Sequence, residues 1–401
     1  MSVKVELGFT ADAAGVTFFT LDDPVLGVLD NTEYVLGGGE VFFDVSEFFI
    51  SYNTNRGKSR ELGRYDAGQA TVRFQNDNRF FDPTFEASPF FGQIVPRREI
   101  RISVDDEVQF LGIVQDWNIA YEPGGQSIAS CQALDAFSFL SGLTLEDDTF
   151  AEELTGARVN RVLNEINWSP TARNIATSRA TLEESEVTGD TEALAYLQKA
   201  ARSEPADFFI SKSGAVTLLP RNIPFTEDGL LFAETGGIPY KTISVIFGSE
   251  LLYNSVQTTS EAGTVTSTDL TSISTYGERD FSEATFLSSI TQLRDLADFL
   301  VAQYSEPEFR FEGLTLDLRA ISPSQRTALL GLELGDVVQV EFTPNNISPA
   351  IERFGKVIGI NQTIQPGSEE MQIRLQDSLG NLLRLDETVF GKLDSGNRLG
   401  F

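Results

Sequence analysis

The sequence predicts a mainly β protein with a small α+β insertion in its middle, and three observations support this prediction. From Val41 to Leu134, β-branched and aromatic residues alternate with polar ones, which is the pattern of half-buried strands. Between residues 146 and 240 the apolar spacing becomes helical, and after residue 241 the alternation returns. At 401 residues the chain has room for two or three domains with sizeable cores.

Residues 1–38 are expected to form an N-terminal arm. They open with a short alternating run from Val3 to Leu7, and glycines 37–39 indicate a flexible turn because no helix follows them. Residues 39–145 are expected to form the first β domain. Its short, closely spaced strands favour a barrel or a sandwich, and they are expected at residues 41–45, 48–52, 71–75, 100–104, 110–121 and 127–134.

Residues 146–240 are expected to form a small α+β middle domain. Apolar residues lie on one helical face between Glu152 and Ile166, and Pro170 ends this helix. A second helix is expected to begin near Asp190 and to end before Pro205. A hairpin over residues 208–218 completes the domain.

Residues 241–401 are expected to form the second β domain with a polar C-terminal tail. Ile243, Val245 and Phe247 alternate as in a strand, and so do the apolar residues from Phe309 to Leu318. Between them, the spacing of leucines predicts a helix over Ile290–Tyr304.

The two β regions end with similar patterns, at Ile100–Asp135 and at Val338–Asp377. Each has an alternating strand, a second strand that begins with an aromatic and a glycine, a Pro-Gly turn and a final strand. The Phe and the Pro-Gly turn are 13 residues apart in the first region and 12 in the second. Pro-Gly turns are common, so coincidence is one explanation; an internal structural duplication is the other.

Composition excludes several classes of function. The chain has 59 acidic and 30 basic residues, a net charge of -29, which opposes general nucleic-acid binding because phosphates are held by Lys and Arg. The same charge is equally compatible with an ordinary solvated surface. The absence of histidine removes Ser–His–Asp and Cys–His nucleophile systems and imidazole zinc ligands. The single cysteine, Cys131, lies in an alternating apolar stretch and is expected to be a buried, inert thiol.

The densest acidic runs, residues 105–107 and 146–148, lie at turn-like breaks where carboxylates are usually only solvated. Residues 76–78 lack the glycine of a calcium loop, and glycines 37–39 lack the Lys-Ser or Lys-Thr of a phosphate loop. No apolar run approaches the 18 or so residues of a membrane-spanning helix. We therefore expect no catalytic residues, no cofactor, no metal and no membrane insertion.

The stretch Arg56–Arg101 is the most distinctive part of the chain. It holds nine of the 30 basic residues and a loop with five phenylalanines, interrupted by three prolines. Such a loop must bury its rings in its own fold or against a partner, and both alternatives are open from the pattern. On the second alternative, the expected assembly interface comprises Arg56, Arg60, Arg64, Phe80, Phe81, Phe85, Phe90 and Phe91.

Three segments together give the chain a resemblance. They are LDDPVLGVLDNTEYVLGG (21–38), RGKSRELGRYDAG (56–68) followed by NRFFDP (78–83), and YSEPEFRFEGLTLDLRA (304–320) followed by LLGLELGDVVQVEF (329–342). In this order they resemble the hub-type minor tail proteins of long-tailed bacteriophages. None of the three is a motif of enzymatic chemistry.

The resemblance implies two tube-type β-barrel domains per chain and a homotrimer that closes a pseudo-sixfold ring. Such a hub sits in the baseplate or tail tip of the virion, adapts the sixfold tail to a threefold tip, and lets the genome DNA pass through its lumen without specific binding. Its partners would be the distal tail protein, the tape-measure protein, and tip or fibre proteins, with assembly in the host cytoplasm. Many such hubs carry a cell-wall hydrolase, and we expect no such domain after the second β region of this chain.

Two alternatives differ in copy number or chemistry. A sixfold distal tail ring protein would need one tube barrel per chain. A carbohydrate-binding tail or receptor-recognition module would present exposed Trp and Tyr, whereas the sequence has two Trp. An enzyme is the third and weakest alternative.

Overall fold

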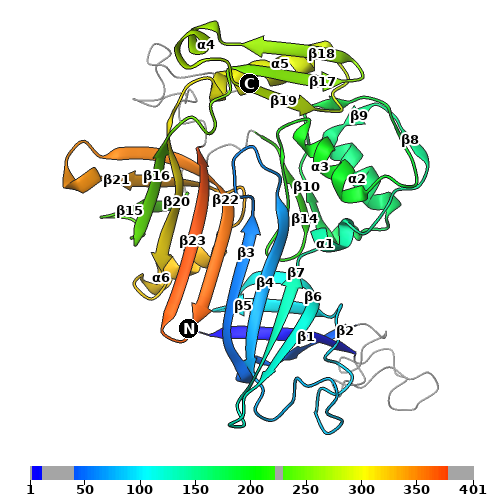
Figure 1. Ribbon diagram of the computed structural model, residues 1–401, viewed down its shortest axis with the longest axis vertical. Coiled ribbons are helices and arrows are strands. Elements are labelled where there is room, and N and C mark those ends of the chain that lie inside the picture. Colours follow the sequence, from blue (N-terminus) through cyan, green and yellow to red (C-terminus); the bar gives the residue numbers. More distant parts are fainter. Residues whose placement is uncertain (1, 11–39, 222–228, 378–401) are drawn as a thin grey trace, which may run out of the picture.

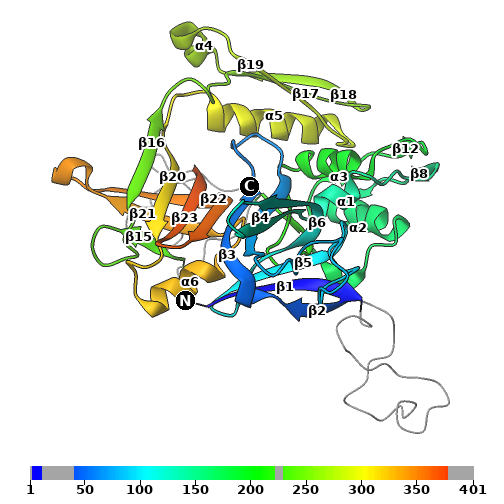
Figure 2. The same cartoon turned by 60° about the horizontal axis from the view of Figure 1, so that its bottom comes forward.

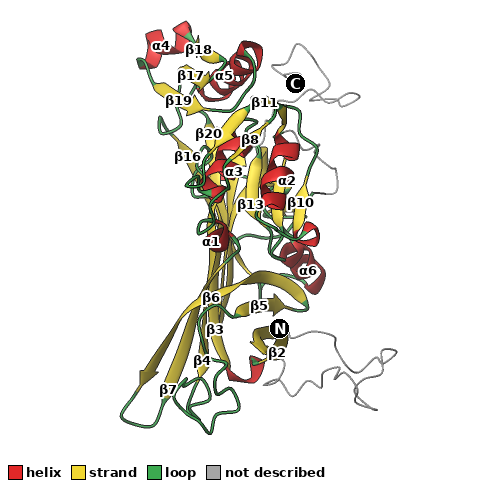
Figure 3. Ribbon diagram, turned by 90° about the vertical axis from the view of Figure 1, so that its right-hand side faces the viewer, coloured by secondary structure: helices red, strands yellow, loops and turns green. Residues whose placement is uncertain are grey.

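The computed structural model describes residues 2–10, 40–221 and 229–377. Most of the expected N-terminal arm and the polar tail lie outside these ranges. The described residues form a mainly β protein, as the sequence predicts (Figure 1). Thirteen strands make one large sheet, whose long strands run down much of the length of the molecule (Figure 3).

The first half of this sheet has the order β3-β4-β7-β6-β5-β1-β2. Neighbouring strands pair antiparallel throughout, and β6 and β7 form the hairpin expected from the turn at Pro123-Gly124. Their bounds are β1 Val3–Thr10, β2 Glu40–Asp44, β3 Phe49–Gly57, β4 Asp66–Gln75, β5 Glu99–Val104, β6 Glu107–Tyr121 and β7 Ser127–Leu134. A 3₁₀ turn, Ser46–Phe48, links β2 to β3, and a short helix α1, Phe137–Leu140, follows β7.

The second half has the order β16-β20-β23-β22-β21-β15. The bounds are β15 Leu231–Ala233, β16 Thr242–Phe247, β20 Phe309–Asp317, β21 Val337–Phe342, β22 Ile351–Gln365 and β23 Ser368–Asp377. Helix α6, Pro323–Gly331, precedes β21; a 3₁₀ turn, Pro344–Asn346, follows it. Ser322 caps α6 by accepting from the Gln325 amide, while the Gln325 side chain accepts from the Ser322 amide.

The two halves therefore share one strand order, with β3, β4, β7, β6, β5 and β1 matched by β16, β20, β23, β22, β21 and β15. One pairing differs in direction, because β15 lies parallel to β21 whereas β1 lies antiparallel to β5. The halves are joined where β3, at the edge of the first half, pairs with the part of β22 that β21 leaves uncovered. This order repeats the pattern seen at the ends of the two β regions in sequence.

The expected closed barrels are not present among the described strands. Each half is an open, curved sheet whose edge is used elsewhere, because β22 pairs with β3 of the other half instead of closing its own. Strand β16 is the edge strand at one end of the large sheet. At the other end, the sheet continues from β6 through β5 and β1 to β2.

The middle of the chain forms an α+β layer beside the first half of the sheet (Figure 1). Helices α2, Thr155–Glu165, and α3, Ala193–Arg202, pack with a three-stranded sheet of order β10-β14-β13. The strands of this layer are β8 Asp148–Phe150, β9 Glu153–Leu154, β10 Arg173–Ile175, β11 Thr181–Leu182, β12 Ser185–Val187, β13 Asp207–Ile210 and β14 Val216–Leu219, with a 3₁₀ turn at Pro170–Ala172.

A further layer lies between β16 and β20 in the chain, and the sequence pattern did not separate it from the second β region. Helix α5, Ile290–Tyr304, packs on a three-stranded sheet of order β18-β17-β19 and has its own cluster of buried residues (Figure 2). The remaining bounds are β17 Ser255–Ser260, β18 Gly263–Thr268, α4 Leu270–Tyr276 and β19 Asp280–Ala284.

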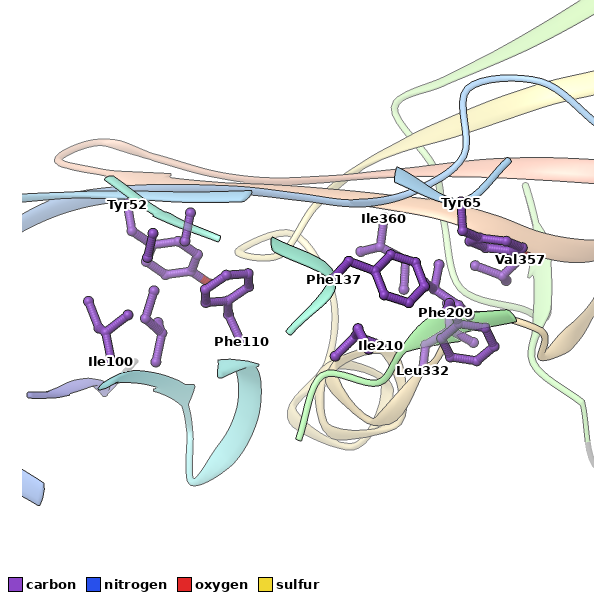
Figure 4. Packing of buried hydrophobic residues seen from close by; sticks show 14 of the residues in the cluster. Tyr52, Tyr65, Ile100, Phe110, Phe137, Phe209, Ile210, Leu332, Val357 and Ile360 are labelled. Atoms are coloured by element: carbon purple, nitrogen blue, oxygen red, sulfur yellow. The ribbon is translucent and has the colours of Figure 1, made fainter. Parts of the chain in front are cut away.

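The main core runs continuously under the large sheet and links its two halves. Tyr52 and Phe110 lie together in the first half, while Phe137 lies beside Ile360 of the second, with Phe209 farther along the same cluster (Figure 4). All five side chains are buried. The continuous core makes the junction of β22 with β3 a rigid part of the chain.

Candidate assembly interface

The basic hairpin, residues 56–64, connects the end of β3 to β4, and two of its cationic side chains point into the chain. Arg56 is buried, pairs with the Glu333 carboxylate and donates to the Ile210 carbonyl oxygen at 3.2 Å. Lys58 is also buried, and its ammonium donates to the Glu61 carbonyl oxygen at 2.8 Å. These two side chains attach the hairpin to its own chain and are not available to a partner.

Asp207 is the centre of the buried charge cluster beneath this hairpin. Its carboxylate accepts from the Lys356 ammonium at 2.6 Å and the Tyr65 hydroxyl at 3.0 Å, and it lies 3.7 Å from the Lys58 ammonium. Burial alone would raise the pKa of Asp207, but Lys356 and Lys58 hold it below its ordinary value. Burial lowers the pKa of Lys58 to about 8. The cluster joins the turn between β3 and β4 to β13 and β22.

The tip of the hairpin stays accessible. Arg60 is exposed and forms an ion pair with Glu250, which is also exposed, at 3.3 Å. Arg64 is exposed as well. Of the three arginines predicted for the interface, these two can still meet a partner, and their role there stays a prediction.

The phenylalanine loop, residues 76–98, buries most of its rings within the chain. Phe81 and Phe90 are 0% and 4% exposed, Phe80 and Phe85 are half-buried, and Phe91 is 48% exposed. Phe48, from the turn before β3, lies within 5.4 to 6.0 Å of the Phe80, Phe81 and Phe90 rings, measured between centroids. Phe9 and Phe43, from β1 and β2, complete the cluster around Phe90.

Within the chain, Phe74 of β4 and Trp117 of β6 stack on Phe81, and Phe9 of β1 and Phe43 of β2 pack against Phe90. The buried rings of Phe81 and Phe90 therefore do not need a partner to cover them. For the exposed ring of Phe91 and the half-buried rings of Phe80 and Phe85, an assembly contact stays a prediction.

Polar side chains hold the loop in this shape. The Asn76 side-chain oxygen accepts from the Phe81 amide at 2.9 Å. Asp82 accepts from the Thr84 hydroxyl at 2.7 Å, the Tyr121 hydroxyl at 2.7 Å and the Arg79 guanidinium at 2.6 Å. These hydrogen bonds hold the pKa of Asp82 well below its ordinary value. A loop with this many internal bonds is preorganised without a partner.

The structure does not bring the two groups of predicted residues together. The basic hairpin lies before β4 and the phenylalanine loop lies after it. Strand β4 has 10 residues, so the two groups are separated by about 33 Å along the strand. The two groups therefore lie at opposite ends of β4.

The most exposed apolar strand, β16, was not among the residues predicted for the interface. Val245 and Ile246 of β16 are each 37% exposed, and Phe247 is 69% exposed. Strand β16 pairs with β20 alone and ends the sheet path, so its outer backbone edge is open within the described part of the chain. The alternation of Ile243, Val245 and Phe247 indicated a strand buried on one face, and nothing in that pattern distinguishes a chain's own core from a partner's.

Two cavities lie near β16 and α5. A cavity of about 410 Å³ separates the hairpin tip from β16 and β20, and its lining includes Arg60, Ser244 and Ile246. A second, of about 550 Å³, lies beside α5 and has acidic lining residues, among them Asp269, Asp298 and Glu306. Within the described ranges no group of three or more His, Cys, Asp or Glu side chains is placed to hold a metal ion. None of the described helices is long and apolar enough to cross a membrane.

Comparisons with known proteins agree with the fold. No protein-family model and no curated protein matches the sequence. A tail protein from Neisseria meningitidis MC58 superposes with a TM-score of 0.60 at 10% identity, covering 95% of this chain and 98% of that one. The 43 kDa tail protein of prophage MuSo2 from Shewanella oneidensis gives 0.58 at 11% identity, covering 93% and 98%. A chain of the Francisella PdpA-VgrG complex gives 0.50 at 9% identity, covering 94% of this chain and 52% of that one.

The first two matches span nearly the whole of both chains, so the likeness includes the two sheet halves and the two smaller layers. This is the class of protein to which the three sequence segments pointed. The chain therefore has the fold of phage tail proteins.

Proposed function

We propose that the protein is the hub of a phage tail tip or baseplate. Three chains form a closed ring of six similar sheet units, two from each chain, around a lumen. The ring adapts a sixfold tail to a threefold tip and is part of the conduit for the genome. The observation that carries the proposal is the repeated strand order of β3-β4-β7-β6-β5-β1 in β16-β20-β23-β22-β21-β15.

Repetition within one chain supports a ring because the halves are already joined side by side. In this contact β3, the edge strand of the first half, pairs with the part of β22 that β21 leaves uncovered. The free edge of β16 at the far end of the same sheet can meet another chain in a similar way. Repeated head-to-tail contacts of one kind close into cyclic rings when the rotation permits, and closure also removes edges that would otherwise pair without control.

The charge of the chain supports a conduit that does not hold its cargo. A net charge of -29 repels DNA phosphates, so the genome passes without specific binding. The distal tail protein, the tape-measure protein and tip or fibre proteins are the proposed partners, and the tail tip of the virion is the proposed location.

The alternatives fit less well. A distal tail ring built from six chains would use one sheet unit per chain, whereas this chain contains two. A sugar-binding module would present its tryptophans, but Trp117 packs on Phe74 and Phe81, and the Trp168 indole donates to the Ala172 carbonyl oxygen. Both tryptophans are half-buried.

The location can be tested with antibodies against the folded chain and electron microscopy of isolated tails. The proposal predicts label at the tail end distal to the capsid and nowhere else. Label along the tube, or at the capsid end, would contradict it. A tail protein from an unrelated phage is the control for non-specific labelling.

A further inference from the structure

The two halves of the sheet contain the same irregularity, which fixes how their residues correspond. In β6, Gln115 is an extra residue between the pairs Val114–Ala133 and Asp116–Gln132. In β22, Ile358 is an extra residue between the pairs Val357–Leu375 and Gly359–Arg374. A bulge is a local feature that re-aims a strand, so its recurrence at one place sets the alignment. Counting from the bulge, Trp117 corresponds to Ile360 and Tyr121 to Ile364.

Beyond its bulge, β22 is covered by β3. Ile364 lies opposite Tyr52, and Ile360 lies opposite Arg56. The corresponding part of β6, from Trp117 to Tyr121, has no strand on that side within the described ranges, because the pairing of β5 with β6 stops at Ile113. The first half of the sheet thus has an open edge where the second half has a junction.

Strand β16 is the counterpart of β3. Tyr52 lies opposite Val72, and Ile243 lies opposite Leu314. In the first half, Val72 pairs with Cys131 of β7, which pairs with Trp117. In the second half, Leu314 pairs with Ile373 of β23, which pairs with Ile360. Because Trp117 and Ile360 correspond, Val72 and Leu314 correspond as well. Ile243 therefore corresponds to Tyr52.

We propose that β16 of one chain pairs antiparallel with the Trp117–Tyr121 part of β6 of a second copy, in the register of the internal junction. Ile243 then lies opposite Tyr121, Val245 opposite Ile119, and Phe247 opposite Trp117. This inference rests on the proposed ring and specifies its contact between chains.

The apolar pattern of the two strands gives an independent check on this register. Directly opposed residues of an antiparallel pair point to the same face. The register inferred from the bulges places three apolar residues of β16 against Tyr121, Ile119 and Trp117, although neither side chains nor hydrophobicity entered its derivation. A slip of one residue would set the same three against residues on the polar face of β6, which includes Asp116 and Asn118.

The exposures also fit a contact that is completed by a second copy. Phe247 is 69% and Tyr121 55% exposed in the single chain, and both are among its most exposed large apolar residues. Because β16 and β6 are different surfaces, each chain offers one and accepts the other. Such a contact propagates head to tail and cannot close a two-chain dimer with identical patches.

A disulfide trap tests the register. Asn118 and Ile246 are directly opposed in the proposed pairing and lie on the face away from the core. Opposed Cα atoms are about 4.5–5.5 Å apart, within the reach of a disulfide. The chain with both Asn118→Cys and Ile246→Cys is expected to form covalent dimers and trimers under mild oxidation. Cys131 can remain, because burial raises the pKa of its thiol to about 12.

The matched control moves one cysteine by two residues along the same face. Asn118→Cys with Ser244→Cys places the Cα atoms beyond about 7 Å, too far for a disulfide, so cross-linking should fall at least tenfold. Each single variant should give no covalent dimer, because the contact is between different surfaces.

The outcomes separate this inference from the proposed ring. If the registered pair fails to cross-link while size-exclusion chromatography still shows a trimer, the strand pairing is wrong and the ring stands. Stronger cross-linking of the control pair would likewise overturn the register. If both double variants and the unaltered chain are monomers, the proposed function and the strand pairing fail together.

Discussion

Removal of the Phe247 ring is expected to weaken assembly without harming the fold. In the single chain 69% of this residue is exposed, so Phe247→Ser removes little from the chain's own core. Full burial of a phenylalanine stabilises by about 1.5–3 kcal/mol, and roughly two thirds of that, about 1–2 kcal/mol, would come from the contact with a neighbour. This corresponds to about 5–30-fold weaker association at each contact, multiplied over three contacts in a closed ring.

Analytical ultracentrifugation over a concentration series is the assay, with the thermal midpoint measured beside it. Leu270→Ser is the matched control, because Leu270 is 75% exposed and lies on α4, outside the two strands of the proposed contact. The expected result is a shift to monomers for Phe247→Ser alone, with thermal midpoints of the isolated chains within a few degrees of each other. Equal association of the two variants, or unfolding of Phe247→Ser, would refute the reasoning.

Three further predictions concern the fold. Arg158→Ala should lower the free energy of unfolding, measured in urea, by roughly 3–5 kcal/mol, because this fully buried guanidinium pairs with Glu153 and donates to two carbonyls and a hydroxyl. Arg161 is an exposed partner of the same Glu153, so Arg161→Ala should lower it by under about 1 kcal/mol. Equal losses for the two variants would contradict this prediction. Phe90→Ser should destabilise by about 3–5 kcal/mol while Phe91→Ser leaves the unfolding midpoint nearly unchanged; the reverse order would place the loop differently. Burial raises the pKa of Asp135 from 3.8 to about 7, so the stability that this group contributes is fully present below pH 3.8 and is lost as the pH rises to 7. The free energy of unfolding of Asp135→Asn should lack that part of the pH dependence. The same change of this free energy with pH in both chains would show that Asp135 is not its source.

The spacing of apolar residues predicted those helices and hairpins that depend only on residues close together in the sequence. The helix at Ile290–Tyr304 begins and ends where the sequence placed it, because its leucines share one face and Pro307 follows. The hairpin of β6 and β7 was predicted for the same reason, since alternation and a Pro-Gly turn are both short-range signals. The mainly β class followed from the sum of such elements.

Short sequence patterns did not predict which strands that lie far apart in the chain pair with each other. The layer formed by residues 255–304 depends on the parallel contact of β17 with β19, which no short pattern encodes. The junction of β22 with β3 joins residues about 300 positions apart and replaces the closed barrels that were expected. Long-range contacts of this kind define the sheet on which the assembly proposal rests.

The candidate interface shows the same limit in its side chains. An aromatic loop looks alike in sequence whether β1 and β2 or a neighbour covers it, and here Phe9 and Phe43 supply the cover for Phe90. Conversely, the alternation in β16 suggested burial, yet Phe247 is exposed. Arg56 and Arg60 are four residues apart in one basic segment, but only Arg60 reaches solvent.

The native mass of the purified assembly tests the three-chain ring most directly. Two sheet units per chain and a sixfold ring require three chains, so the expected mass is about 132 kDa, three times the 44.1 kDa of one chain. Native mass spectrometry resolves this from other copy numbers without any label. A mass of about 132 kDa is the predicted result; a stable monomer of 44.1 kDa at micromolar concentration, or an assembly of six chains, would contradict the account.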